Sequence, residues 1–243
     1  MKQVSVVISS CDKYHYLWDI QLQMWAKHWP DCPYDVYMLS EHGQLPEVEV
    51  PFTLFNCNTN RPVTGAGDWS LNLIDLLSHL DSEYIIYSQE DYIFLTPVDT
   101  NRLGVLMNYV AVNKLNYVRF YLSPGGNGDR IELDENLSIR EILPNSPWRS
   151  NLSMARWKRE VLLETLRKHA GIAPWSFEHV GCNEYDKFYC IDTVLEGETD
   201  IFPWYGMYGS SNGYGIYPTI EPILTKFGIK KADGSDINYD IRL

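Results

Sequence analysis

The sequence of 243 residues has little positive charge, no long apolar run and no CxxC pair. No stretch approaches the roughly 20 consecutive apolar residues that span a bilayer. The apolar run in MKQVSVVISSCDKY is too short for the core of a signal peptide. The cysteines are odd in number, at Cys11, Cys32, Cys57, Cys182 and Cys190. Their spacing excludes a disulfide framework and a zinc knuckle. We therefore expect a cytoplasmic protein, with a peripheral place at the inner membrane left open.

Basic residues are also scarce, with 20 Lys and Arg against 32 Asp and Glu, which gives a formal net charge of −12. Such a chain repels phosphate backbones and anionic lipid, so a general nucleic-acid binder is not expected. The motifs GxxxxGK[ST] and HExxH are absent from the sequence. Their absence removes support for P-loop ATPase and zinc protease chemistry.

The composition that remains is that of one globular domain over residues 1–243, with 45% hydrophobic and 21% charged residues. Aromatic residues make up 14%, including 17 Tyr and 8 Trp. Aromatic side chains offer flat amphipathic surfaces to sugars and bases, and they also fill cores. Both interpretations stay open for any single ring.

The first hundred residues predict strands that alternate with helices. QVSVVIS, YDVYMLSE, FTLFNC and EYIIYSQEDYIFL are rich in β-branched and aromatic residues, which is typical of strands. YHYLWDIQLQMWAKHW and WSLNLIDLLSHL have apolar residues at helical spacing. This order predicts an α/β fold with a mostly parallel sheet flanked by helices.

The remaining residues, 101–243, predict a smaller and less regular region. RLGVLMNYVAVNKL reads as a helix, NYVRFYLSP as a strand, and GGNGDRIELDENLSIREIL as a hairpin. SPWRSNLSMARWKREVLLETLRKHAG predicts one helix, with Ser150 and Ser153 as capping residues and Gly171 as its stop.

Polar residues follow three of the predicted strands, at Ser9–Asp12, Ser40–Glu41 and Gln89–Asp91. Ligands of parallel α/β sheets bind beyond the carboxyl ends of the strands. Glu90 and Asp91 interrupt an otherwise apolar run, and buried unpaired carboxylates are costly. We expect the pair to lie at a cleft, where it binds a cation or forms ion pairs at a strand end. By strand alternation Gln89 and Asp91 share one face and Glu90 the other.

These segments together resemble the GT-A nucleotide-sugar glycosyltransferases, especially family 2, over roughly Val4–Asp99 and more weakly to Asp186. The resemblance rests on VSVVISSCDK, on a second strand that ends in Glu41, on GAGDWSLN, and on YIIYSQEDYIFLTP. GAGDWSLN lacks the family's Ala-Arg, and Gln-Glu-Asp stands in place of Asp-x-Asp. The resemblance implies a Rossmann-like GT-A fold, with residues 1–100 binding the nucleotide-sugar and 101–243 facing the acceptor.

On the donor side, the resemblance implies that Asp12 and Glu41 contact the nucleotide; solvated loop acids are the alternative. Ser9, Gln89 and Glu90 are further candidates for donor contacts. Asp68 is another, although as the residue before a predicted helix it also suits an N-cap. Asp91 is the candidate ligand for a divalent cation, Mn²⁺ or Mg²⁺, which neutralises a diphosphate leaving group.

On the acceptor side, the resemblance implies a carboxylate that takes the proton from the attacking hydroxyl. Glu178 is our first candidate for this base, and Glu184 and Asp186 are the others. His179 is a metal ligand or a histidine at the edge of the core. Arg156 and Arg159 are placed by the pattern near one face of a helix, where they grip a phosphate or are solvated.

A loop rich in glycine and tyrosine, Tyr205–Tyr217, is expected to cover the donor, to line the acceptor site or to form a structural turn. The leading functional hypothesis is a hexosyltransferase-type enzyme that uses a nucleotide-diphosphate sugar and a glycan or lipid-linked acceptor, as in bacterial surface-polysaccharide synthesis. The non-enzymatic alternative is a carbohydrate- or partner-binding module on the same fold. A sugar nucleotidyltransferase ranks below both, because SSCDKY carries no glycine after the first strand.

Overall fold

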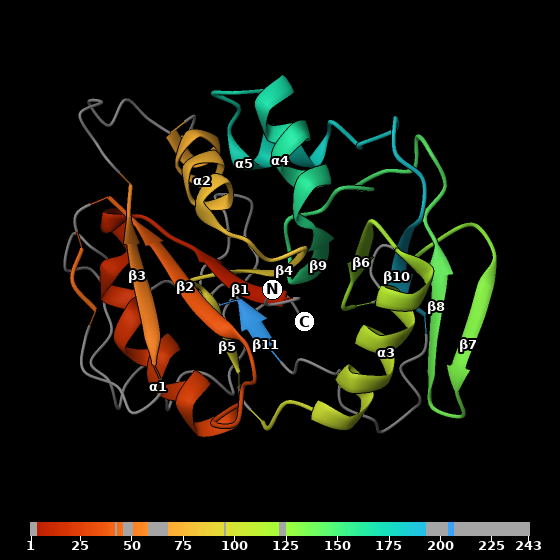
Figure 1. Cartoon of the computed structure of the whole chain (residues 1–243), viewed down its shortest axis with the longest axis horizontal. Helices are drawn as coiled ribbons and strands as arrows, with labels where there is room; N and C mark the ends of the chain where they lie inside the picture. Colours follow the sequence, from red (N-terminus) through yellow and green to blue (C-terminus); the bar gives the residue numbers. More distant parts are fainter. Residues whose placement is uncertain are drawn as a thin grey trace, which may run out of the picture.

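Nine strands form one mixed sheet through the middle of the protein (Figure 1). The computed structural model describes residues 4–41, 43–45, 51–57, 68–94, 96–121, 125–192 and 204–206. The strands are β1 (Val4–Ser9), β2 (Asp35–Ser40), β3 (Phe52–Asn56), β4 (Tyr84–Gln89), β5 (Tyr92–Phe94), β6 (Tyr117–Arg119), β7 (Arg130–Asp134), β8 (Leu137–Glu141), β9 (Ala155–Lys158), β10 (Phe188–Ile191) and β11 (Trp204–Gly206). The helices are the 3-10 helix η1 (Asp12–Leu17), α1 (Trp18–His28), α2 (Asp68–His79), α3 (Thr100–Asn113), α4 (Arg159–Lys168) and α5 (Pro174–Glu178).

The first half of the sheet is parallel, with strand order β3-β2-β1-β4. Val6 pairs with Val36 on one side and with Ile86 on the other. This 3-2-1-4 order, with α1 between β1 and β2 and α2 between β3 and β4, is that of a Rossmann-like sheet. The α/β fold class predicted from the sequence, a GT-A-like or Rossmann-like sheet flanked by helices, is confirmed.

The second half of the sheet is mixed and continues the order as β9-β6-β10-β8-β7. Strand β9 is antiparallel to both β4 and β6, while β10 is parallel to β6 and antiparallel to β8. Because β9 is antiparallel to both of its neighbours, β6 runs in the same direction as β4. Strands β6 and β10 therefore run the same way as β1 and β4. The carboxyl ends of all four strands therefore meet at one edge of the sheet, which we call the carboxyl edge.

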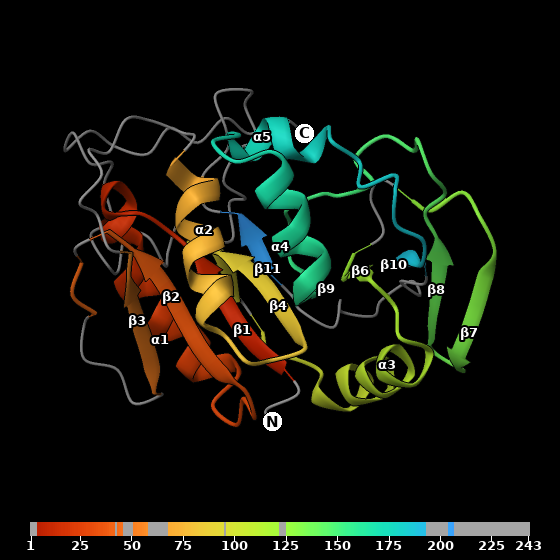
Figure 2. The same cartoon turned by 45° about the horizontal axis from the view of Figure 1, so that its top comes forward.

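Helices cover the two faces of the sheet in separate layers (Figure 2). Because side chains alternate along a strand, Val6 and Val7 belong to different cores. The core that contains Val6 includes α1 and α3, through residues such as Trp25 and Leu106. The core that contains Val7 includes α2, α4 and α5, through Leu73, Leu162 and Phe177 among others.

Three segments differ from the sequence predictions. The run from 84 to 94 is two strands, since a turn at Glu90 and Asp91 separates β4 from β5. The helix predicted from Ser150 begins only at Arg159, because Ala155–Lys158 pairs between β4 and β6. Strand β10 was not predicted, since its four residues carry no clear alternation. Within the described ranges, no helix is long and apolar enough to cross a membrane.

A candidate functional site at the carboxyl edge

The loops after β1 and β2 are joined by two acids. The backbone amide of Asp12 donates to Glu41 Oε2 at 2.6 Å, and the amide of Glu41 donates to Asp12 Oδ1 at 3.1 Å. Ser40 Oγ also donates to Asp12 Oδ1 at 2.5 Å, and Asn72 Nδ2 donates to Glu41 Oε1 at 3.2 Å. Burial raises the pKa of Glu41, against the hydrogen bond from Asp12. The structure thus brings these two predicted donor-side acids together and pairs them with each other's backbone.

The ends of β1 and β4 are joined by an indole from the start of α2. Trp69 Nε1 donates to Ser9 Oγ at 3.0 Å and lies 3.3 Å from the hydroxyl of Tyr87. Gln89 Nε2 donates to the same hydroxyl at 3.3 Å, and burial raises the pKa of Tyr87 to about 12. Gln21 on α1 donates to the backbone oxygen of Gln89 at 2.7 Å. Ser9 and Gln89 therefore belong to one neutral hydrogen-bond network.

The acidic pair Glu90 and Asp91 occupies the turn that follows this network. Burial raises the pKa of Asp91 to about 7. Burial, and then the charge of Asp91, raise the pKa of Glu90 well above its usual value, and Glu41 adds to the repulsion. Within the part of the chain that the structure describes, Asp91 Oδ1 is buried without a hydrogen-bond partner. Because β4 ends at Gln89, strand alternation does not govern the pair, and the predicted sharing of faces does not apply.

An unpartnered buried carboxylate oxygen suits a cation ligand, so the residues present fit a divalent ion held through Asp91. Among the residues that the structure describes, no cluster of three His, Cys, Asp or Glu side chains gathers as a metal site. Mg²⁺ sites commonly take one or two protein carboxylates, with phosphate and water as the other ligands. A metal at Asp91 would therefore need ligands from outside the protein as well.

A group of hydroxyls continues from the acidic pair toward β6. Tyr121 donates from its hydroxyl to Asn151 Oδ1 at 2.7 Å and also hydrogen-bonds Ser153 Oγ. The hydroxyl of Tyr92, the residue after Asp91, interacts with Ser153 as well. Burial raises the pKa of Tyr121 to about 12, so this group is uncharged at neutral pH.

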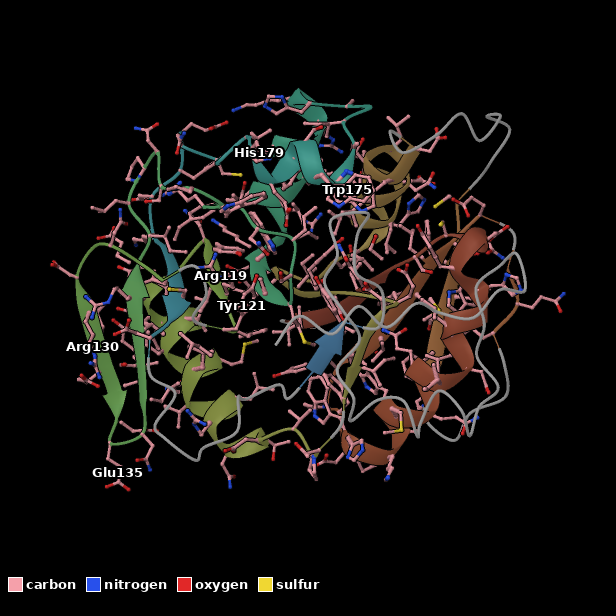
Figure 3. The ribbon with its side chains drawn as sticks, turned by 180° about the vertical axis from the view of Figure 1, so that it is seen from behind. Arg119, Tyr121, Arg130, Glu135, Trp175 and His179 are labelled. Atoms are coloured by element: carbon pink, nitrogen blue, oxygen red, sulfur yellow. The ribbon has the colours of Figure 1, made fainter. Side chains whose placement is uncertain are left out.

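Glu178 lies at the other end of the hydroxyl group. Its Oε1 accepts from the backbone amide of Leu152 at 2.9 Å, between Asn151 and Ser153. Burial raises the pKa of Glu178, while the hydrogen bond and the charges of His179 and Arg119 act in the opposite direction. Figure 3 shows Arg119, at the end of β6, and Tyr121, two residues after it, below His179, which directly follows α5. The structure thus brings Glu178 to the carboxyl edge.

Asp186 and Glu184, the other candidate bases, are held elsewhere. Asp186 accepts from Asn116 Nδ2, at its backbone oxygen (3.0 Å) and at Oδ1 (3.3 Å). Asn116 precedes β6, so this contact lies at the amino end of that strand, opposite the carboxyl edge. Glu184 is bound to Lys168 Nζ at 2.8 Å on the surface, which lowers its pKa. Neither residue is brought to the hydroxyl group.

The two arginines expected on one helix face occupy different elements. Arg156 is on β9, buried, with its guanidinium 3.5 Å from the centre of the Tyr84 ring; burial lowers its pKa to about 10. Arg159 begins α4 and donates to the backbone oxygens of Ser82 and Leu77, at 2.8 and 2.9 Å. The prediction that they lie near one face of a helix is therefore wrong, and Arg156 is buried and not solvated.

Two predicted features lie at or beyond the limits of the described chain. Asp68 is the first residue of α2, as its suitability for a helix start suggests, and the GAG preceding it lies outside the described residues. Of the loop Tyr205–Tyr217, only residues 205 and 206 are described. Their strand, β11, pairs antiparallel with β5 and sets Gly206 opposite Tyr92. Residues 207–217 lie outside the described part.

Several residues at this edge were not singled out as site residues from the sequence, namely Tyr87, Tyr92, Arg119, Tyr121, Asn151 and Ser153. Ser153 was expected only as a helix cap. The sequence held one usable signal, since NYVRFYLSP predicts a strand whose carboxyl end carries Arg119 and Tyr121. The sequence could not show that β9 lies between β4 and β6. This position of β9 brings residues 151–153 beside Tyr121. The pairing depends on contacts between residues far apart in the chain.

No protein-family model and no curated protein matches the sequence. Among solved structures, S. aureus TarS is 12% identical with a TM-score of 0.47, over 78% of this chain and 36% of that chain. The 1–349 portion of S. aureus TarS is 13% identical with a TM-score of 0.44, over 78% and 60%. The bifunctional IspDF from Campylobacter jejuni is 12% identical with a TM-score of 0.43, over 81% and 50%. The chain thus spans from about a third to three fifths of these structures, and at such scores the likeness says nothing of chemistry.

Proposed function

We propose that the protein is a glycosyltransferase that moves a sugar from a nucleotide-diphosphate donor to a hydroxyl of a glycan or lipid-linked acceptor. The observation that carries the proposal is the arrangement of the carboxyl edge. Acids after β1, β2 and β4 lie at the same edge as Glu178, which reaches it from α5 through Leu152. A transfer reaction needs both a donor side and a base beside the acceptor.

On the donor side, Asp91 would hold a divalent cation together with the diphosphate. When bound, the cation would neutralise the charge that develops on the diphosphate leaving group. Ser9, Gln89 and Glu90 would contact the donor from the ends of β1 and β4. Asp12 and Glu41 each accept hydrogen bonds from the protein, and Glu41 is buried. We therefore infer that Asp12 and Glu41 hold the loops after β1 and β2 in place and do not contact the nucleotide base directly.

On the acceptor side, Glu178 would take the proton of the attacking hydroxyl. A general base is most effective when its pKa lies near the working pH. Partial burial raises the pKa of Glu178 in that direction, and the Leu152 amide fixes one oxygen. The hydroxyls of Tyr121 and Ser153 would orient the acceptor nearby.

The acceptor class and the setting are part of the same proposal. The resemblance described above supports three further parts of the proposal. These are a hexosyl donor, a role in the assembly of a bacterial surface polysaccharide, and a cytoplasmic or membrane-peripheral location. A carbohydrate-binding module is the second candidate. It is favoured by Gln89 in place of an acid and by the saturation of Glu41 with protein hydrogen bonds.

The first test is a thermal-shift titration of the purified protein with UDP, GDP, CMP and TDP, each with and without Mn²⁺. A ligand that binds only the folded state adds about 2.7 kcal/mol of stability at a hundredfold excess over its Kd. We expect one nucleotide to raise the melting temperature, more so with Mn²⁺, and Asp91→Ala to remove the metal-dependent part. Asp81→Asn, an exposed acid before β4, is the control.

Donor turnover then separates the two candidates. The matching nucleotide-sugar should be hydrolysed or transferred by the wild type and not by Asp91→Ala. If no nucleotide shifts the melting temperature and no nucleotide-sugar is consumed, the transferase proposal fails and the binding module stands in its place.

A further inference from the structure

Trp148 is a large aromatic residue held in an unfavourable backbone conformation at the surface. Its φ is +55°, in the left-handed region where a bulky side chain is a rare exception. Its side chain is 40% exposed, whereas four other tryptophans, Trp18, Trp25, Trp29 and Trp157, are buried. Such strain persists where the surroundings impose it, and it tends to mark functional positions.

Two buried arginines impose this conformation. Arg119 Nη1 donates to the backbone oxygen of Trp148 at 3.3 Å. The guanidinium of Arg149, the next residue, donates to the backbone oxygens of Ile142, Cys182 and Tyr185 at 2.9, 2.7 and 2.9 Å. The loop around Trp148 is thus fixed from beneath, and the ring is presented in advance of any ligand.

The exposed ring is adjacent to the proposed base. The ring centres of Trp148 and His179 lie 4.6 Å apart, and His179 directly follows Glu178. Trp175, on α5, is 59% exposed, and His179 is the C-cap of the same helix, four residues further along the chain. Figure 3 shows Trp175 and His179 at the same end of the molecule, above Arg119 and Tyr121. We call Trp148, Trp175 and His179 the aromatic platform.

We propose that the aromatic platform binds the acceptor glycan, with one pyranose ring stacked on the Trp148 indole and the chain continuing over Trp175. A pyranose has an apolar C–H face and a rim of hydroxyls, which matches aromatic faces beside Glu178, Tyr121 and Ser153. The net charge of −12 argues against a polyanionic partner at this surface. The role of this glycan as acceptor rests on the proposed function. Glycan binding to the platform does not, because it requires no donor.

The test uses a glycan microarray that displays hexose, N-acetylhexosamine, deoxyhexose and uronic acid oligosaccharides. Trp148→Gly removes the ring at a position where glycine adopts the left-handed conformation without cost, so the fold should be kept. Trp148→Phe keeps an aromatic face. We expect the wild type to bind one glycan class, Trp148→Gly to weaken it about tenfold or more, and Trp148→Phe to retain most of it. Val112→Ser, at a 71% exposed position on α3, is the matched surface control.

A second readout locates the glycan on the protein. In protein labelled with 5-fluorotryptophan, the ¹⁹F signal missing from Trp148→Phe identifies Trp148, and the bound oligosaccharide should shift it. Binding to no glycan on the array, or undiminished binding by Trp148→Gly, would overturn the assignment. Nucleotide binding without glycan binding leaves the transferase proposal standing and rejects the platform. Glycan binding through Trp148 without nucleotide binding would support the platform and reject the transferase proposal.

Discussion

Asp12 and Glu41 each accept a hydrogen bond from the other's backbone amide, at 2.6 Å to Glu41 Oε2 and 3.1 Å to Asp12 Oδ1. The pair ties the loop after β1 to the loop after β2, and Asn72 adds a contact from α2. Residues that lie 29 positions apart in the chain thereby hold this part of the carboxyl edge in one conformation.

Glu41→Gln should destabilise the protein, because two donors, Asp12 N and Asn72 Nδ2, face the two carboxylate oxygens. A glutamine offers one acceptor oxygen, so one donor would face an NH₂ group. We expect a loss of about 1–2 kcal/mol in the free energy of unfolding, measured in urea. Glu135→Gln, an exposed acid between β7 and β8, should change it by less than about 0.5 kcal/mol. Equal effects of the two substitutions would show that the hydrogen bonds to Glu41 contribute nothing to stability.

Asp91→Asn should stabilise the protein without ligand while it removes activity. In the wild type the carboxylates of Glu90 and Asp91 repel each other, and Asp91 Oδ1 has no partner. A neutral amide of the same shape relieves that repulsion. We expect a gain of about 1 kcal/mol at about pH 8, measured by urea unfolding. A loss of stability would instead indicate that the carboxylate is needed to hold the turn.

Glu178→Gln should change how stability depends on pH. Burial raises the pKa of Glu178 in the folded protein, so the folded state binds the proton more tightly than the unfolded chain does. The resulting stabilisation is complete below about pH 4, near the unfolded pKa, and is lost as the pH rises through the folded value. The stability of the glutamine variant relative to wild type should therefore rise with pH across that window. Glu160→Gln, at an exposed position on α4, is the matched control.

The same substitution should affect turnover if Glu178 is the base. The rate of transfer should rise with pH through the raised pKa of Glu178, since only the carboxylate accepts a proton. Glu178→Gln should lower kcat by about 10²–10⁴ and leave the nucleotide-induced thermal shift intact. Asp186→Asn and Glu184→Gln should keep wild-type kcat. A full loss of activity in Asp186→Asn would move the base to the other edge of the sheet.

Arg149→Met should be strongly destabilising. The guanidinium is buried, lies 4.2 Å from the centre of the Phe188 ring, and donates to backbone oxygens on either side of the chain turn at Gly181. Methionine fills much of the volume but leaves these oxygens without donors. We expect a loss of about 3 kcal/mol or more, by urea unfolding. Arg167→Met, on the exposed side of α4, should cost less than about 0.5 kcal/mol. Near-wild-type stability of Arg149→Met would mean that water replaces the guanidinium.

The predictions made from sequence hold best where the signal is local. Strands β1 and β2 and helices α2 and α3 lie within two residues of their predicted bounds, because period and composition specify them. The prediction fails at 150–158, where residues with helical spacing form β9 between β4 and β6. There the unpaired edges of two neighbouring strands outweigh local propensity. Arg156, which was expected on a helix face, is therefore buried on β9.

The sequence by itself determined the α/β class, the parallel first half and the polar residues after β1, β2 and β4, since all of these follow from short-range patterns. The tertiary structure alone distinguished Glu178 from Asp186 and set Trp148 beside His179. Those choices depend on which strands pair and in which direction, and therefore on which loops share an edge. Strand pairing is decided by burial between distant segments, and no local pattern in this chain encodes it.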